Sequence, residues 1–211
     1  MKEIERLFKS KVLCMFLGGS TAYGLQSYNS DRDIMVIVDD DKPLRHLPLY
    51  NEEASTKTEY FIMGRGYFRR VHAFDEDTND FIVAHADNIL GINLPGNLIY
   101  LDESYEEEFN QIINEDWILK LPKFLHRFVN FYRLTVSPNA PNYKKHYHVY
   151  RIRAMLDNLD KTGSFNLNYA EPYKSMITVF KEHNKVLPSK QTEIGKILDY
   201  IENYANTLEE K

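Results

Sequence analysis

A glycine pair that directly follows a short apolar run most constrains how this chain can fold. Residues 11–17 have the length and composition of a buried strand, and residues 18–20, Gly-Gly-Ser, come immediately after them. Residues 21–26 can form a short helix, and the apolar run over residues 31–38 predicts a second strand. The first forty residues are therefore expected to form a strand, a tight turn into a helix, and a strand.

The glycine turn and a pair of aspartates supply complementary chemistry. Gly18 and Gly19 let the backbone come close to a phosphate, and the helix start at Ser20 presents unpaired amide groups to an anion. Asp31 and Asp33 are two residues apart, so in a strand they point to the same face. Two such carboxylates repel each other unless a cation lies between them, and oxygen ligands suit Mg²⁺ or Mn²⁺. The pattern predicts a site for phosphoryl or nucleotidyl transfer.

This order of motifs resembles the signature of the DNA polymerase β-like nucleotidyltransferase superfamily, in which a Gly-[Gly/Ser]-Ser turn precedes an Asp-x-[Asp/Glu] pair. More narrowly, Gly-Ser-x-Ala-Tyr-Gly followed by Ser-Asp-x-Asp is similar to a family of predicted nucleotidyltransferases of bacteria and phages. That family includes members described as associated with RNA ligases. The residues that carry the resemblance are Gly19, Ser20, Ala22, Tyr23, Gly24, Ser30, Asp31 and Asp33.

The resemblance extends to two later places in the chain. Family members have a third acidic residue on a strand nine positions before a Phe, and Glu59 stands nine positions before Phe68 here, although Asp is more usual. They also have a Lys-x-x-Tyr-His-x-x-Arg pattern in a later helix. That pattern is matched by Lys144, His148 and Arg151, which the resemblance makes candidates for binding the triphosphate or an acceptor.

The resemblance also implies a mechanism. Asp31, Asp33 and Glu59 would be the catalytic metal ligands and would hold two divalent ions, Mg²⁺ or Mn²⁺. Ser20 and the amides that follow Gly19 would bind the β and γ phosphates of a nucleoside triphosphate such as ATP. The α-phosphorus would then be open to in-line attack, with pyrophosphate as the leaving group.

Outside this segment, the periodicity of apolar residues separates two halves of the chain. A helix over residues 2–10 precedes the first strand, and a polar loop leads to a third strand over residues 56–63. A helix over residues 67–73 comes next, and residues 81–100 have a mixed pattern. The first half is therefore predicted to be a small mixed sheet with helices.

Beyond residue 103 the apolar residues recur at helical spacing. The expected fold class is α+β, with a nucleotidyltransferase catalytic domain over residues 1–102 and a C-terminal helical domain over residues 103–211. The helices predicted in the second domain span residues 121–136, 143–161, 172–184 and 190–208.

Charge is unevenly distributed along the chain. The 31 acidic and 26 basic residues give a formal net charge of -5, which excludes a uniformly basic nucleic-acid-binding protein. Between Trp117 and Leu156, however, there are eight Lys or Arg and no Asp or Glu. This cationic segment either binds phosphates of a nucleotide or nucleic acid, or forms ordinary ion pairs with the acidic first half.

The single cysteine, the N-terminus and the long uncharged run bear on the cellular compartment of the protein. Cys14 is the only cysteine and lies in the first apolar run, so we expect it to be buried and without a disulfide within the chain. The N-terminus is charged, and polar residues interrupt the long uncharged run over residues 12–30. Neither a signal peptide nor a membrane-spanning helix is expected. These features predict a cytoplasmic protein with no membrane partner.

The leading hypothesis is a metal-dependent nucleotidyltransferase that moves a nucleoside monophosphate from a nucleoside triphosphate to a hydroxyl group. The acceptor can be an RNA or DNA end, a small molecule or a protein. One alternative is a catalytically degenerate module of the same fold that binds a nucleotide or a partner. A phosphohydrolase is disfavoured because no His-Asp dyad is present: His72 and His85 are each followed by Ala.

Overall fold

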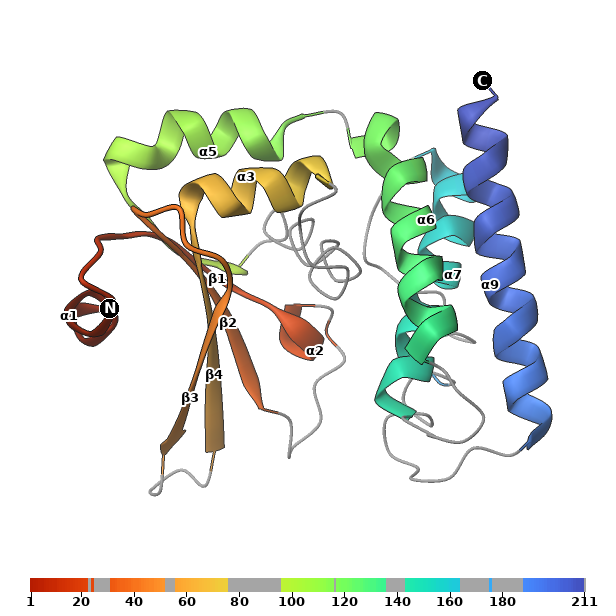
Figure 1. Cartoon of the computed structure of the whole chain (residues 1–211), viewed down its shortest axis with the longest axis horizontal. Helices are drawn as coiled ribbons and strands as arrows, with labels where there is room; N and C mark the ends of the chain where they lie inside the picture. Colours follow the sequence, from red (N-terminus) through yellow and green to blue (C-terminus); the bar gives the residue numbers. More distant parts are fainter. Residues whose placement is uncertain are drawn as a thin grey trace. The chain divides into compact units, whose positions relative to one another are not determined.

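The chain divides into two units, a sheet with its helices and a helical unit (Figure 1). The first unit comprises Met1–Thr78 and Ala86–Asp116, and the second comprises Asn79–His85 and Trp117–Lys211. A computed structural model of the chain describes residues 1–22, 24, 31–51, 56–75, 96–115, 117–135, 143–163, 175 and 188–210.

Within the described residues of the first unit, the strands form one mixed sheet in the order β3-β4-β2-β1-β5. β1 is antiparallel to both β2 and β5, and β3 is antiparallel to β4. β2 and β4 run parallel as neighbours, because the chain crosses to the sheet edge and returns through β3 before it enters β4. The strands are β1 Val12–Leu17, β2 Arg32–Val38, β3 Arg45–Asn51, β4 Thr56–Gly64 and β5 Leu98–Leu101.

The prediction of a polar loop after the second strand was wrong, because β3 lies within that segment. Its sequence contains Pro48, which cannot donate a hydrogen bond to a ladder. β3 is an edge strand of the described sheet, where β4 is its one neighbour, so the proline is tolerated there. The mixed segment over residues 81–100 ends in β5, and residues 81–95 lie outside the described part of the chain.

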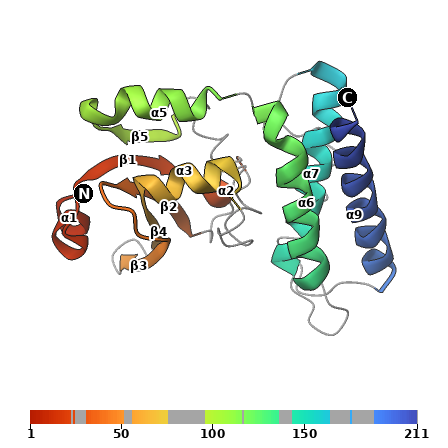
Figure 2. The same ribbon diagram turned by 45° about the horizontal axis from the view of Figure 1, so that its top comes forward.

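Helices cover the two faces of this sheet differently. Helix α1 (Lys2–Phe8) buries Ile4 against one face, and α3 (Arg65–Ala73) and α5 (Glu106–Ile113) lie on the other side (Figure 1, Figure 2). Burial of such apolar side chains stabilises the fold by about 1.5–3 kcal/mol each. The core on the α1 side consists of Ile4, Val12, Met15, Ile34, Val36, Val38 and Ile62.

Cys14 projects from β1 and has no exposed surface, which confirms the prediction that it is a core residue. Burial raises the pKa of its thiol to about 12. The thiol therefore stays protonated near neutral pH and acts as a small apolar side chain.

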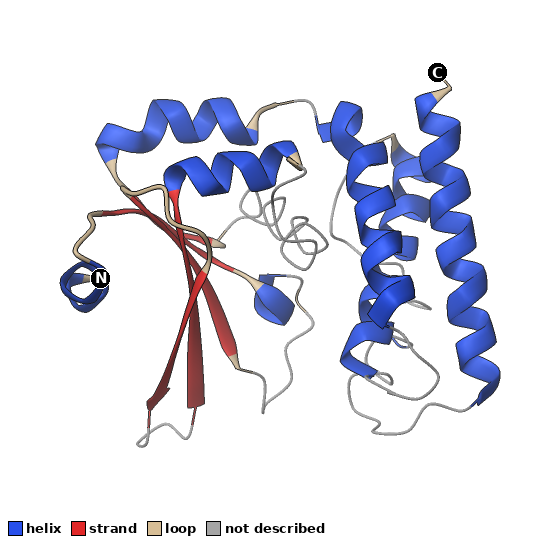
Figure 3. Ribbon diagram, viewed as in Figure 1, coloured by secondary structure: helices blue, strands red, loops and turns tan. Residues whose placement is uncertain are grey.

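The second unit contains α6 (Trp117–Thr135), α7 (Tyr143–Thr162) and α9 (Pro188–Glu209). The described strands all lie in the first unit, as Figure 3 shows. α7 agrees with its predicted range, and Gly163 follows it with a φ of 65°, the left-handed conformation that commonly ends a helix. The helix predicted over residues 172–184 falls almost wholly outside the described residues.

Together the units give an α+β fold, as the sequence predicted. In α7 the predicted core stripe is confirmed, because Val149, Ile152, Leu156 and Leu159 are all buried. None of the helices in the described residues is both long enough and apolar enough to cross a membrane.

Candidate active site

The parallel pairing of β2 and β4 places Asp33 beside Glu59. The register pairs these two residues directly, so their side chains project to the same face of the sheet. Asp31 precedes the first residue of β2 and stands two positions before Asp33, which assigns it to that face as well. The structure thus brings the three predicted metal ligands to one end of the β2–β4 pair.

A lysine that the sequence analysis did not select lies among these carboxylates. Lys57 Nζ donates a hydrogen bond to Glu59 Oε1, and it lies 4.0 Å from Asp31 Oδ2. The hydrogen bond to Glu59 raises the pKa of Lys57, and the negative charges of Glu59, Asp31 and Asp33 act in the same direction. A positive charge is therefore present where the three carboxylates approach one another.

The second oxygen of Glu59 faces β3. His46 Nε2 lies 3.6 Å from Glu59 Oε2, and the imidazole stacks on the ring of Phe61 with centroids 4.9 Å apart. The edge strand that the sequence did not predict therefore contributes a side chain to this site. Only the register between β3 and β4 could have identified His46.

The glycine turn contacts Asp33 directly. Gly18 N donates a hydrogen bond of 2.9 Å to the backbone oxygen of Asp33. Gly19 has a φ of 55°, and a Cβ atom there would lie 1.7 Å from Asp33 Oδ2 and 2.7 Å from its Cγ. Only glycine permits both the backbone conformation and this close approach. The turn and the Asp33 carboxylate therefore form one closely packed structure.

The turn continues into α2 (Gly19–Ala22), which begins two residues before its predicted start. Ser20, the predicted phosphate ligand, lies in this short helix and is 9% exposed. Tyr23 and residues 25–30, which include most of the predicted remainder of the helix and Ser30, lie outside the described residues.

Asn97 holds the turn at both of its ends. Its backbone oxygen accepts a 2.9 Å hydrogen bond from Leu17 N, and its Nδ2 donates to the backbone oxygen of Ala22 over 3.3 Å. Asn97 is 8% exposed and immediately precedes β5. Its position next to the turn depends on the long-range pairing of β1 with β5, so no local sequence signal could have revealed it.

The chemistry of these side chains fits a divalent metal ion. Carboxylate oxygens on one face are the ligands that Mg²⁺ and Mn²⁺ prefer, and the Lys57 ammonium already supplies a cation among them. In the described part of the chain, no three His, Cys, Asp or Glu residues converge closely enough to hold a metal ion as they stand. Lys57 contacts two of the three candidate ligands, Glu59 and Asp31.

The other predicted binding residues belong to α7 in the second unit. Arg151 is completely buried, and its Nη2 lies 3.1 Å from His148 Nδ1. The structure therefore brings these two residues together. The side chain of Lys144 lies outside what the structure describes. A role of these three residues in phosphate binding stays a prediction.

Two arginines of the cationic segment form ion pairs. Arg133 lies 2.7 Å from Asp199 and 2.8 Å from Glu202, both in α9. Arg153 pairs with Asp157 over 2.9 Å within α7. These acidic partners belong to the helical unit itself. Arg133 and Arg153 therefore form ordinary ion pairs, as one of the two alternatives predicted. The expectation that their acidic partners lie in the first half of the chain was wrong.

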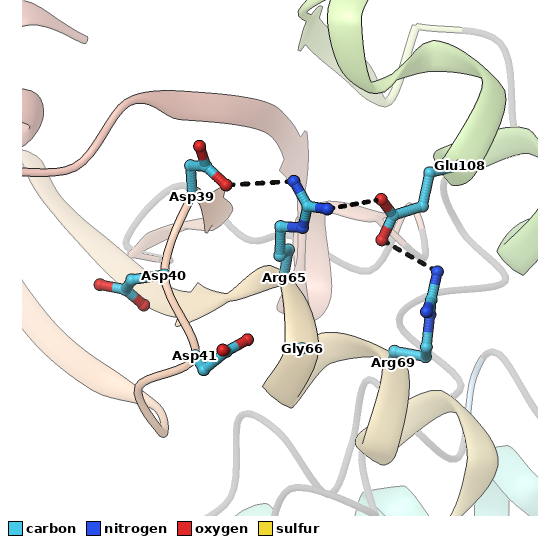
Figure 4. Close-up of a pocket in the computed structure, with 7 residues that line it drawn as sticks. All are labelled: Asp39, Asp40, Asp41, Arg65, Gly66, Arg69 and Glu108. Carbon is cyan, nitrogen blue, oxygen red and sulfur yellow. Dashed lines mark hydrogen bonds and ion pairs between the residues drawn. The ribbon is translucent and has the colours of Figure 1, made fainter.

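A pocket of about 460 Å³ lies at the opposite end of β2 and β4 (Figure 4). Arg65 bridges Asp39 at 3.1 Å and Glu108 at 3.3 Å, and Arg69 lies 3.1 Å from the other oxygen of Glu108. The seven residues of β2 separate this pocket from the candidate site by about 20 Å. The lining residues are Asp39, Asp40, Asp41, Arg65, Gly66, Arg69 and Glu108.

A glycine turn packed against paired strand carboxylates is the arrangement that the resemblance to nucleotidyltransferases implied. The family profile described as "Nucleotidyltransferase domain" matches residues 1–146, so the chain belongs to this family. That membership fits the DNA polymerase β-like superfamily, which the glycine turn and the aspartate pair resemble.

One solved structure with overall similarity is a nucleotidyltransferase-like protein from Exiguobacterium sibiricum 255-15. The two chains are 13% identical, and the match covers 98% of this chain and 73% of the other, with a TM-score of 0.34. A likeness at that level supports no further conclusion. No curated protein matches the chain significantly.

Proposed function

We propose that this chain is a metal-dependent nucleotidyltransferase that moves a nucleoside monophosphate from a nucleoside triphosphate to a hydroxyl acceptor and releases pyrophosphate. Family membership supports transfer of a nucleoside monophosphate in general. The observation that supports this site most is the direct pairing of Asp33 with Glu59, next to a turn in which Gly19 packs against Asp33.

The side chains have distinct proposed roles. Asp31, Asp33 and Glu59 would hold Mg²⁺ or Mn²⁺. Such ions, when bound, neutralise the charge of a triphosphate and lower the pKa of an attacking hydroxyl group. Gly19 keeps the backbone close to Asp33, and Ser20 and the amide groups of the turn would bind a phosphate. Bound phosphates would therefore lie next to the carboxylates.

We place a second set of phosphate contacts on α7. Lys144, His148 and Arg151 lie in the cationic segment. Arg151 Nη2 lies 3.1 Å from His148 Nδ1, so these two side chains orient each other. These residues would bind the triphosphate or the acceptor. The acceptor is an RNA or DNA end, a small molecule or a protein, and we propose a cytoplasmic location for the reaction.

The test is incubation with each α-labelled nucleoside triphosphate, Mg²⁺ or Mn²⁺, and candidate acceptors, with label transfer and pyrophosphate followed. Label on a nucleic-acid end, a small molecule or protein identifies the acceptor. Asp33→Asn should abolish transfer, whereas the matched control Asp39→Asn, at the other end of the same strand, should retain it. Equal transfer by Asp33→Asn and the natural chain would remove the metal-site interpretation.

A binding module without catalysis is the second candidate. The observation that favours it is the ion pair between Lys57 and Glu59, together with the absence of a converged metal-ligand group among the described residues. This alternative predicts tight nucleotide binding with no label transfer to any acceptor. Transfer that requires Asp33 would exclude it.

A further inference from the structure

Lys57 lies at the candidate site because of the same register between β2 and β4 that pairs Asp33 with Glu59. β2 and β4 pair Arg32 with Thr58, so the preceding residues, Asp31 and Lys57, are also neighbours. Lys57 stands two positions before Glu59 and shares its face of the sheet. Its ammonium group donates a hydrogen bond to Glu59 and lies 4.0 Å from Asp31. Its side chain is 39% exposed, against 16% for Glu59.

The charges at this position do not balance. The Lys57 ammonium has two carboxylate partners, Glu59 and Asp31, whereas the ammonium of Lys11 pairs with one carboxylate, Asp102, at 2.7 Å. Carboxylates held together without a cation disfavour one another's ionised state. The ammonium offsets part of this repulsion and leaves room for a more highly charged cation.

A divalent ion and the Lys57 ammonium would compete for the same oxygen atoms. Glu59 Oε1 already accepts the hydrogen bond from Lys57, so a metal ion bound to the same oxygen would lie close to the ammonium group and would be repelled by it. The lysine stem is flexible, and its charge is readily hydrated, so the ammonium can leave for the solvent. Asp33 and Glu59 lie within β2 and β4, and Asp31 stands directly before β2, so the backbone of all three is held by the sheet.

We propose that Lys57 is an internal counter-ion of the metal site: it holds Glu59 close to Asp31 in the metal-free protein and leaves Glu59 when a divalent ion binds. The inference rests on the proposed function, because it takes these carboxylates as the metal ligands. Lys57 is a positioning residue, which acts through the carboxylates and has no contact with substrate in this scheme. Its presence lowers the affinity of the site for free metal ions.

The first test measures Mn²⁺ binding without nucleotide, from the electron paramagnetic resonance signal of free Mn²⁺. Lys57→Gln should bind Mn²⁺ about fivefold more tightly, the factor that corresponds to about 1 kcal/mol for a partly exposed ion pair. Lys57→Arg retains the charge and should restore the weaker binding. Lys11→Gln breaks a lysine pair outside the site and should leave the affinity unchanged.

The second test uses the natural chain, so it does not depend on whether a variant folds. Lysines are acetylated with an amine-selective reagent, and the rate at each site is followed by mass spectrometry. Saturating Mn²⁺ should raise the rate at Lys57 by about fivefold, since the metal breaks its ion pair. The rate at Lys11, which pairs with Asp102, should not change.

The outcomes separate this inference from the proposed function. Unchanged Mn²⁺ affinity in a folded Lys57→Gln variant, or unchanged acetylation of Lys57 at saturating Mn²⁺, would overturn the counter-ion role. In either case the proposed function stands as long as the natural chain binds Mn²⁺ and Asp33→Asn does not. If the natural chain binds no Mn²⁺, with or without nucleoside triphosphate, both proposals fail.

Discussion

The two ends of the β2–β4 pair carry similar numbers of charges in different arrangements. At the start of the strands, one lysine faces Asp31, Asp33 and Glu59. At their other end, Arg65 bridges two carboxylates and Arg69 joins the same network (Figure 4). The ion pairs of the second arrangement are balanced, because Arg65 and Arg69 pair with Asp39 and Glu108, so they stabilise the fold without a ligand. In the first arrangement one lysine has two carboxylate partners, Glu59 and Asp31, so its ion pairs carry excess negative charge, which is what a cation site requires.

The largest expected effect comes from removing a carboxylate at the unbalanced end. Asp33→Asn should lower label transfer by more than about 100-fold, because it removes a direct metal ligand. Mutation of residues that only hydrogen-bond to metal ligands already lowers activity by about 10–100-fold. The free energy of unfolding should stay the same or rise, since one of the mutually repelling charges is lost. Chemical denaturation alongside the transfer assay checks both. A large loss of stability would contradict the comparison.

Gly19→Ala should be the next most severe change. The left-handed backbone costs an alanine about 1–2 kcal/mol, and the added Cβ would displace the carboxylate of Asp33. Gly163→Ala is the matched control, because Gly163 has a φ of 65° and no described atom within 4 Å of such a Cβ. Gly19→Ala should lose at least as much stability in urea denaturation as Gly163→Ala, but only Gly19→Ala should lose Mn²⁺ affinity. Equal affinity in both would show that the turn does not position Asp33.

At the balanced end, a charge change should affect stability alone. Glu108→Gln breaks contacts with Arg65 and Arg69 and should lower the free energy of unfolding by about 0.5–1 kcal/mol. The effect should shrink at high salt, where such pairs are screened. Denaturation at low and high ionic strength measures the difference. A loss of nucleotide transfer at unchanged stability would show that this pocket belongs to the active site.

Asp102 lies at neither end of the β2–β4 pair, and its substitution should have the smallest effect, a change in how stability depends on pH. Hydrogen bonds from Lys11 and Ser104 lower the pKa of this carboxyl below its usual value. A lowered pKa stabilises the fold above the pKa of the unfolded chain, about 3.9, and that contribution is lost as the pH falls further. The stability difference between the natural chain and Asp102→Asn should therefore shrink below about pH 4. A constant difference between pH 3 and 7 would contradict this.

The sequence predicted the parts of this fold that depend on local pattern. The first strand, the turn at Gly18 and Gly19, and the helix α7 follow from apolar periodicity and glycine placement. β3 was not predicted, because it is an edge strand that contains Pro48 and has weak alternation. The proposed boundary at residue 102, between catalytic and helical domains, stays a prediction.

What the sequence determined by itself was the local chemistry: two aspartates two residues apart, and a glycine turn before them, fix which side chains share a strand face. The tertiary structure decided their neighbours. The partner that β4 places beside Asp33 depends on a long-range register, and shifting that register by one residue would turn Glu59 and Lys57 to the other face. Local periodicity contains no information about that register, so only the folded sheet reveals Lys57 among the carboxylates.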